Sequence, residues 1–98
     1  DEATYAYEVA IAAQTTAGNM NKLGSAQVAW GRYAEARDTL TKAILLDSNA
    51  ADPHYFLALV SIAEGKNDEA RTELNRYLEL SPDGRWSGEA RQYLQTLP

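Results

Sequence analysis

The chain has 98 residues, 45% of them hydrophobic and 23% charged, with a net charge of −5. This length and composition are those of one small folded domain rather than of a disordered tail. No apolar run approaches the ~20 residues of a membrane-spanning helix, and the negative charge disfavours a nucleic-acid partner, whose phosphates need clustered Lys and Arg. Cysteine is absent, which excludes disulfides and thiolate metal sites.

Six helices are predicted from the placement of glycines, prolines and helix-capping residues. Their expected bounds, in chain order, are 2–17, 20–30, 33–46, 53–64, 67–80 and 87–97. Gly18 is expected to end the first helix, Asn19 to cap the second, and Asp52 to cap the fourth ahead of Pro53. No stretch shows the alternation of apolar and polar residues typical of a strand, so the predicted fold class is all-α.

The last predicted helix follows a turn at 81–84 and carries an apolar stripe. The members of this stripe are Trp86, Ala90, Tyr93, Leu94 and Leu97. Their helical spacing predicts that one face of this helix packs on the helices before it.

A Glu-Ala pair, with a large side chain four places after the Ala, recurs along the chain. The three copies are Glu2-Ala3 with Tyr7, Glu35-Ala36 with Leu40, and Glu69-Ala70 with Leu74. Their alanines are 33 and then 34 residues apart, a period typical of arrays of helical hairpins. Residues 17–50 align with residues 51–84, which places Gly31 and Gly65 at the same point of each unit, where one helix must end.

These units resemble the tetratricopeptide repeat (TPR), a helix–turn–helix of about 34 residues with the pattern W-x₂-L-G-x₂-Y…A-x₃-F…P. The matching positions are Leu23-Gly24 and Ala36-x₃-Leu40 in the first unit, and Leu57-Ala58, Ala70-x₃-Leu74 and Pro82 in the second. Ser48 stands where the first unit would have its proline. The sequence also departs from the pattern at the Trp position, held by Met20 and His54, and at the Tyr position, held by Gln27 and Ser61.

The resemblance implies an α-α superhelix of TPR helical hairpins forming a single domain over residues 1–98. Residues 1–16 resemble the second helix of a truncated repeat, so we expect the chain to be the C-terminal part of a longer array. Residues 17–50 and 51–84 are then complete repeats. Residues 85–98 are expected to form a capping helix, because Ala90 follows Ala70 by only 20 residues, too few for another hairpin.

In the family, the first helix of each repeat lines a concave groove that holds peptides or proteins. The resemblance therefore implies a peptide-binding face made by Asn21, Ser25, Val28, Tyr55, Leu59 and Ile62. Family members that clamp a C-terminal carboxylate have Lys and Asn where this chain has Asn21 and Ser25, so that role is not implied. The face is apolar with one aromatic ring, which suits a hydrophobic segment or helix. In the alternative reading, Leu59 and Ile62 simply pack against neighbouring helices.

Residue types that carry chemistry occur without the spacing that chemistry needs. His54 is the only histidine, and Asp52 is its only nearby candidate co-ligand, so no metal site is predicted. Gly65-Lys66 lacks the preceding glycine and following hydroxyl residue of a phosphate-binding loop. Trp30 and Trp86 are expected to fill the core rather than to stack on a ligand. The sequence therefore predicts neither an enzyme nor a cofactor.

The sequence thus favours a non-catalytic interaction scaffold that docks a protein or peptide on its concave face. The alternative is a structural or oligomerisation element of a larger protein. Ala3, Tyr7 and Ala10 would form an uncovered apolar stripe, so a homodimer through the N-terminal helix is also expected.

Overall fold

The computed structural model describes residues 15–98, and within this range the chain is helical with no strand. The helices are α2 (Ala17–Ala29), α3 (Tyr33–Leu46), α4 (Asp52–Ala63), α5 (Asn67–Leu80) and α6 (Ser87–Thr96). The predicted all-α class is confirmed, and the predicted bounds of α3 and α5 are those observed. The predicted helix over 2–17 and the dimer contact assigned to it lie almost entirely outside the described residues.

The start of α2 differs from the prediction. Thr16 has an extended backbone, and its side-chain oxygen accepts a hydrogen bond from the Asn19 amide at 3.1 Å, so Thr16 is the N-cap. Gly18 and Asn19 lie inside the first turn of α2. The predictions that Gly18 ends a helix and that Asn19 caps the next are therefore wrong. Gly18 is also not among the glycines with positive φ, the conformation a helix-ending glycine would adopt.

The turns that close the two hairpins are alike. Gly31 and Gly65 both have φ of 76°, a left-handed conformation that glycine adopts without strain. In each turn the amide after the glycine donates to the carbonyl five residues before it, at 2.8 Å in both cases. The predicted role of these glycines in ending α2 and α4 is confirmed, and it explains why both hairpins turn in the same way.

The N-terminus of α4 begins one residue earlier than predicted. Ala51 occupies the N-cap position with a helical backbone, and no side chain caps the helix. Asp52 therefore lies within the first turn, ahead of Pro53, and its predicted capping role is wrong. Its carboxylate is left free of the backbone amides it was expected to cap.

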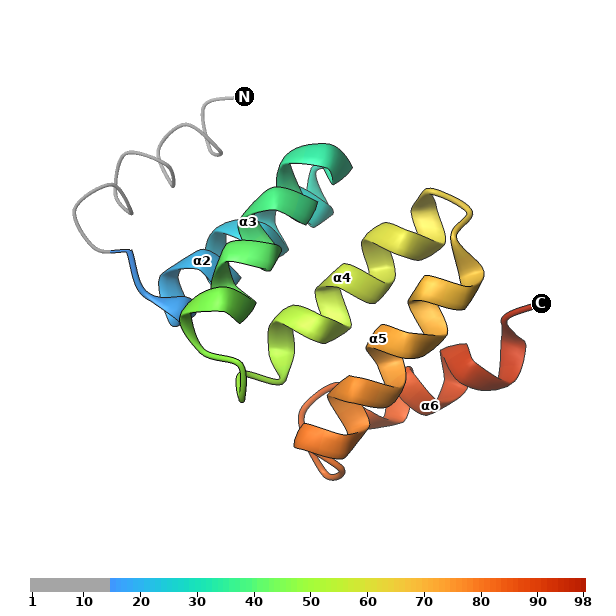
Figure 1. Cartoon of the computed structure of the whole chain (residues 1–98). Helices are drawn as coiled ribbons and strands as arrows, with labels where there is room; N and C mark the ends of the chain where they lie inside the picture. The colour runs from blue at the N-terminus through green and yellow to red at the C-terminus, as the bar shows by residue number, and fades with distance from the viewer. Residues whose placement is uncertain (1–14) are drawn as a thin grey trace.

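The two hairpins, α2–α3 and α4–α5, lie side by side, and α6 follows along α5 (Figure 1). Helix α4 packs on α2 and α3 of the first hairpin as well as on its own partner α5. The small residues of the repeat pattern lie at these contacts: Ala36, Ala58 and Ala70 are fully buried. Ala36 and Leu40 of α3 form one core cluster with Leu57 and Val60 of α4, which joins the hairpins.

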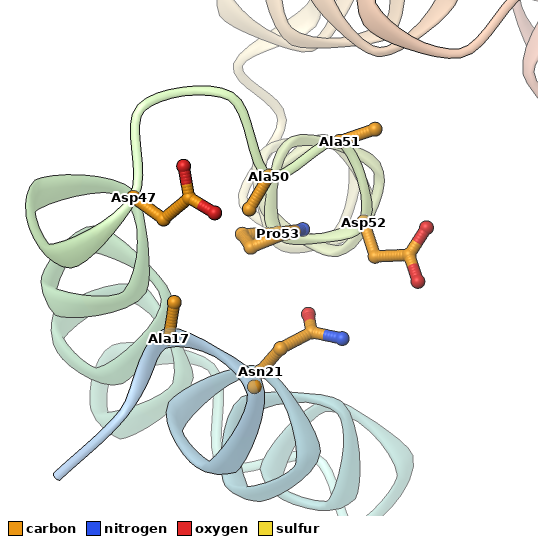
Figure 2. Close-up of a pocket in the computed structure, with 8 residues that line it drawn as sticks. Ala17, Asn21, Asp47, Ala50, Ala51, Asp52 and Pro53 are labelled. Carbon is orange, nitrogen blue, oxygen red and sulfur yellow. The ribbon is translucent and has the colours of Figure 1, made fainter.

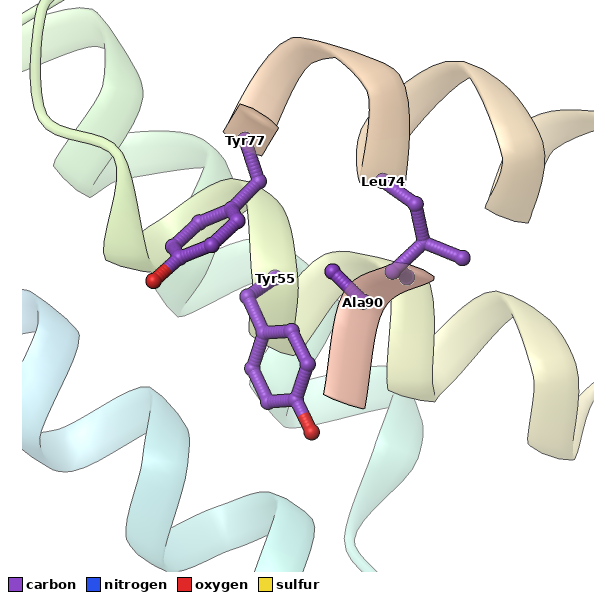
Figure 3. Close-up of a cluster of buried hydrophobic side chains, with 5 residues drawn as sticks. Tyr55, Leu74, Tyr77 and Ala90 are labelled. Carbon is purple, nitrogen blue, oxygen red and sulfur yellow. The ribbon is translucent and has the colours of Figure 1, made fainter. Parts of the chain in front are cut away.

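A second core cluster joins α4, α5 and α6 (Figure 3). Its buried members are Tyr55, Ala58, Leu74, Tyr77 and Ala90. The predicted apolar stripe of α6 packs on this cluster, as expected from its spacing. The Tyr77 hydroxyl also accepts a hydrogen bond from the Trp86 amide at 2.8 Å, so the core of the second hairpin fixes the start of α6.

Candidate functional site

The α2 residues predicted to face a groove are spaced i, i+4 and i+7, so they lie on one stripe of the helix. Asn21, Ser25 and Val28 are all half-buried. The Ser25 hydroxyl donates to the Lys22 carbonyl at 2.9 Å, and Val28 packs on the core cluster that joins the hairpins. The Asn21 Oδ1 atom is buried without a hydrogen-bond partner in the described part of the chain.

The α4 stripe has the same spacing, but its aromatic member is not exposed as predicted. Tyr55 is only 5% exposed, and its ring stacks on that of Trp86 at 5.2 Å between centroids and 4° between planes. The prediction of an exposed groove ring is wrong, because Trp86, at the start of α6, covers it. Leu59 is half-buried and packs on the same core cluster, whereas half-buried Ile62 belongs to none of the core clusters.

The hydroxyl of Tyr55 behaves differently from its ring. It has no hydrogen-bond partner among residues 15–98, and it is not one of the fully buried unpaired atoms, so its tip reaches solvent. Figure 3 shows this hydroxyl pointing away from Leu74. Burial raises the pKa of Tyr55 to about 12, with smaller contributions from nearby Tyr93, Glu89 and Tyr77. At neutral pH the phenol therefore keeps its proton and can donate it in a hydrogen bond.

Helix α6 carries a third stripe in register with the other two. Glu89, Tyr93 and Thr96 follow the α4 stripe by 34 residues at each position, just as the α4 stripe follows that of α2. Together with Gln92 they line a pocket of about 250 Å³. The sequence analysis treated α6 only as a cap and missed these residues. The 34-residue offset was the signal that could have found them.

A second pocket, of about 330 Å³, opens where the start of α2 meets the α3–α4 loop (Figure 2). Its lining residues are Ala17, Gly18, Asn21, Asp47, Ala50, Ala51, Asp52 and Pro53. Figure 2 shows Asn21 of α2 facing Pro53 and Asp52 across this pocket. Asp47 accepts a hydrogen bond from the Asn49 amide at 3.0 Å. The side chains here offer mainly hydrogen-bond acceptors.

The remaining charged groups are structural. Arg37 donates to Glu64 at 2.6 Å and to Glu69 at 2.8 Å, and the buried Ser61 hydroxyl also donates to Glu69 at 2.6 Å. These bonds tie α3 to α4 and α5. The Arg37 guanidinium holds the pKa of both carboxyl groups below their usual range, and Ser61 adds to this for Glu69.

His54 is buried, and its Nδ1 atom lies 2.8 Å from Glu73 Oε1, so it bridges α4 and α5. Within residues 15–98 no group of three His, Cys, Asp or Glu side chains is arranged to hold a metal ion. None of the described helices is long and apolar enough to cross a membrane.

Paired antiparallel helices stacked at a 34-residue period define a helical-repeat protein. A family model, described as tetratricopeptide repeat, matches residues 28–91, which is more than half of the chain. The chain therefore belongs to the tetratricopeptide repeat family, as its sequence pattern predicts. Repeats of this family generally mediate protein–protein interaction and are typically not enzymes. No curated protein matches the chain.

Proposed function

We propose that this chain is a non-catalytic docking module that holds a protein or peptide segment on the face formed by the first helices of its hairpins. This inner face consists of Asn21, Ser25 and Val28 on α2, Leu59 and Ile62 on α4, and Glu89, Tyr93 and Thr96 on α6. The observation that carries the proposal is the common 34-residue register of the three stripes. Tyr55 supports the face from beneath with its ring and contributes only its hydroxyl to the surface.

The packing of α6 supports its inclusion in this face. It carries a stripe at the spacing of a first helix, yet the positions where a second helix would pack are polar and exposed. These positions are Gly88, Arg91, Gln92 and Gln95. We therefore propose that α6 extends the docking surface and also caps the hairpins of 17–50 and 51–84 with a polar outer side.

A rigid stack of this kind binds without an ordering cost in the scaffold, which favours docking of an extended or helical segment. The alternative function, a structural element that only assembles a larger protein, would place the contact elsewhere. Leu45 marks such a surface, since it is 80% exposed near the end of α3.

The test uses peptides selected from a random phage-displayed library on the full chain. Ile62→Gln removes apolar surface from the inner face at a side chain outside the core clusters, and Leu45→Gln makes the same change on α3. Docking on the inner face predicts that Ile62→Gln weakens the selected peptides by ~1 kcal/mol or more, while Leu45→Gln has little effect. Loss of binding only with Leu45→Gln would contradict the proposal and favour the structural alternative.

A further inference from the structure

The acidic residues of the chain differ in whether a basic side chain neutralises them. Those on α3, α5 and the α4–α5 turn are mostly paired: Glu35, Glu64, Asp68, Glu69 and Glu79 each lie within 3.5 Å of an arginine nitrogen. Asp47, Asp52 and Glu89 form no ion pair with any described residue. These three line the two pockets that flank the inner face.

The pocket between α2 and α4 collects acceptors without donors. The carboxylates of Asp47 and Asp52 border it, together with the buried and unpaired Oδ1 atom of Asn21. The α6 pocket adds the Glu89 carboxylate and the aromatic ring of Tyr93. Neither pocket has a lysine or arginine in its lining.

An independent feature of the same surface is the Tyr55 hydroxyl. The side chain is more than nine-tenths buried, yet this one polar atom reaches the surface without a hydrogen-bond partner in the described structure. It lies close enough to Glu89 and Tyr93 to interact with both electrostatically. A phenol oxygen beside a carboxylate and an aromatic ring forms a suitable environment for a cationic side chain.

The inner face also has a direction. On each helix the polar acceptor lies near the start, at Asn21, Asp52 and Glu89, whereas α2 and α4 carry Val28 and Ile62 near their ends. Equivalent positions of stacked hairpins lie side by side, so one edge of the face is acidic and the other apolar.

We propose that the occupant of this face is a basic segment of a protein, with lysine or arginine side chains on the acidic edge and aliphatic side chains over Val28, Leu59 and Ile62. This inference rests on the proposed function and specifies its partner. Charge complementarity carries it, because unpaired carboxylates across an interface favour cationic partners and reject acidic ones. Arg85 on the same side of the molecule already holds its guanidinium 4.9 Å from the Trp86 ring centroid, which shows that a cation can lie against these rings.

The experiment sequences the peptides selected on the full chain and measures their affinity for four variants. Asp52→Asn, Glu89→Gln and Tyr55→Phe change the proposed cation contacts with almost no change of shape. Glu79→Gln is the control, because it removes the same charge from an exposed pair on α5. Thermal melting confirms that each variant is folded.

The expected result is enrichment of Lys and Arg beside Leu or Ile in the selected peptides. The Asp52→Asn and Glu89→Gln double variant should bind them about three- to tenfold more weakly, and added salt should erase most of this difference. Tyr55→Phe should weaken binding about two- to threefold, and Glu79→Gln should leave it unchanged.

The failure of this inference can be told apart from the failure of the proposed function. Peptides that are sensitive to Ile62→Gln but neutral or acidic, and unaffected by the double variant, would overturn the basic partner and keep the docking face. Peptides insensitive to every inner-face variant, or no binders at all, would overturn both.

Discussion

Gly24 illustrates how one residue sets the distance between the helices of a hairpin. A Cβ atom built on Gly24 would overlap the Leu40 side chain, whereas one on Gly18 meets nothing within 4 Å. Gly24→Ala gains up to ~1 kcal/mol of helix propensity but overpacks the α2–α3 contact at a cost of ~1–3 kcal/mol.

We therefore expect Gly24→Ala to lower the free energy of unfolding by about 1 kcal/mol, measured by urea denaturation. Gly18→Ala makes the same chemical change in open space and should be neutral or stabilise by ~0.5–1 kcal/mol. Equal effects of the two substitutions would contradict the close packing of α2 on α3.

Tyr77 makes a second residue-scale prediction. Tyr77→Phe leaves the Trp86 amide without its acceptor and should destabilise the chain by ~1–2 kcal/mol. The Tyr93 hydroxyl has no such bond, so Tyr93→Phe should change the free energy of unfolding little. Thermal unfolding of both variants checks this, and a Tyr77→Phe protein as stable as the parent would show that the bond does not hold α6.

Single residues also mark the limits of the sequence analysis. The 34-residue pattern places Tyr55 on the inner stripe of α4, and that position on the helix is correct. Its burial depends on Trp86, which is 31 positions later and reaches it only through the packing of α6. Asp52 likewise has the residue type of an N-cap, but the helix begins at the residue before it. Both errors arise from contacts or backbone angles that local sequence does not determine.

At the scale of helices, the bounds of α3 and α5 could be predicted from sequence because a glycine turn precedes each of them. The small positions that bring helices together could also be predicted, since Ala36 and Ala70 are both fully buried. The binding potential of α6 could not be seen from its core stripe alone, because that stripe describes only the side that packs inward.

The buried alanines predict a cost for larger side chains. Ala70→Leu should destabilise the chain by ~1–3 kcal/mol through overpacking, and Ala36→Leu should behave alike. Ala34→Leu, at an exposed position of α3, is the matched control and should have little effect. A melting temperature unchanged by the two core substitutions would contradict the repeat packing.

The Arg37 network predicts how the contact between hairpins depends on pH. Arg37 lowers the folded-state pKa of Glu69 and Glu64, so their stabilising contribution is present above the ordinary glutamate pKa of about 4.3. It is lost as pH falls from that value through the lowered folded-state pKa.

We expect the melting temperature to fall more steeply with acid below about pH 4.5 than in an Arg37→Met variant, which lacks this contribution. Arg76→Met is the control, because Arg76 bonds only Glu79 within its own helix. Parallel pH profiles for the parent and Arg37→Met would show that the network adds nothing.

At the scale of the molecule, two hairpins and α6 combine a continuous core with one surface of common register. The core clusters and the Arg37 network hold the helices in fixed order, so the three stripes keep their spacing without a bound partner. The family, the fold class and the repeat period followed from sequence. The acidic edge did not, because it depends on which carboxylates find an arginine in the folded chain.

The most direct test of the central claim maps the chemical shifts of the ¹⁵N-labelled full chain as a library-selected peptide is added. The account predicts that the largest changes fall on Asn21, Ser25, Leu59, Ile62, Glu89 and Tyr93, along three helices but on one face. Changes confined to the outer residues of α3 and α5, such as Leu45 and Glu79, would contradict docking on the inner face.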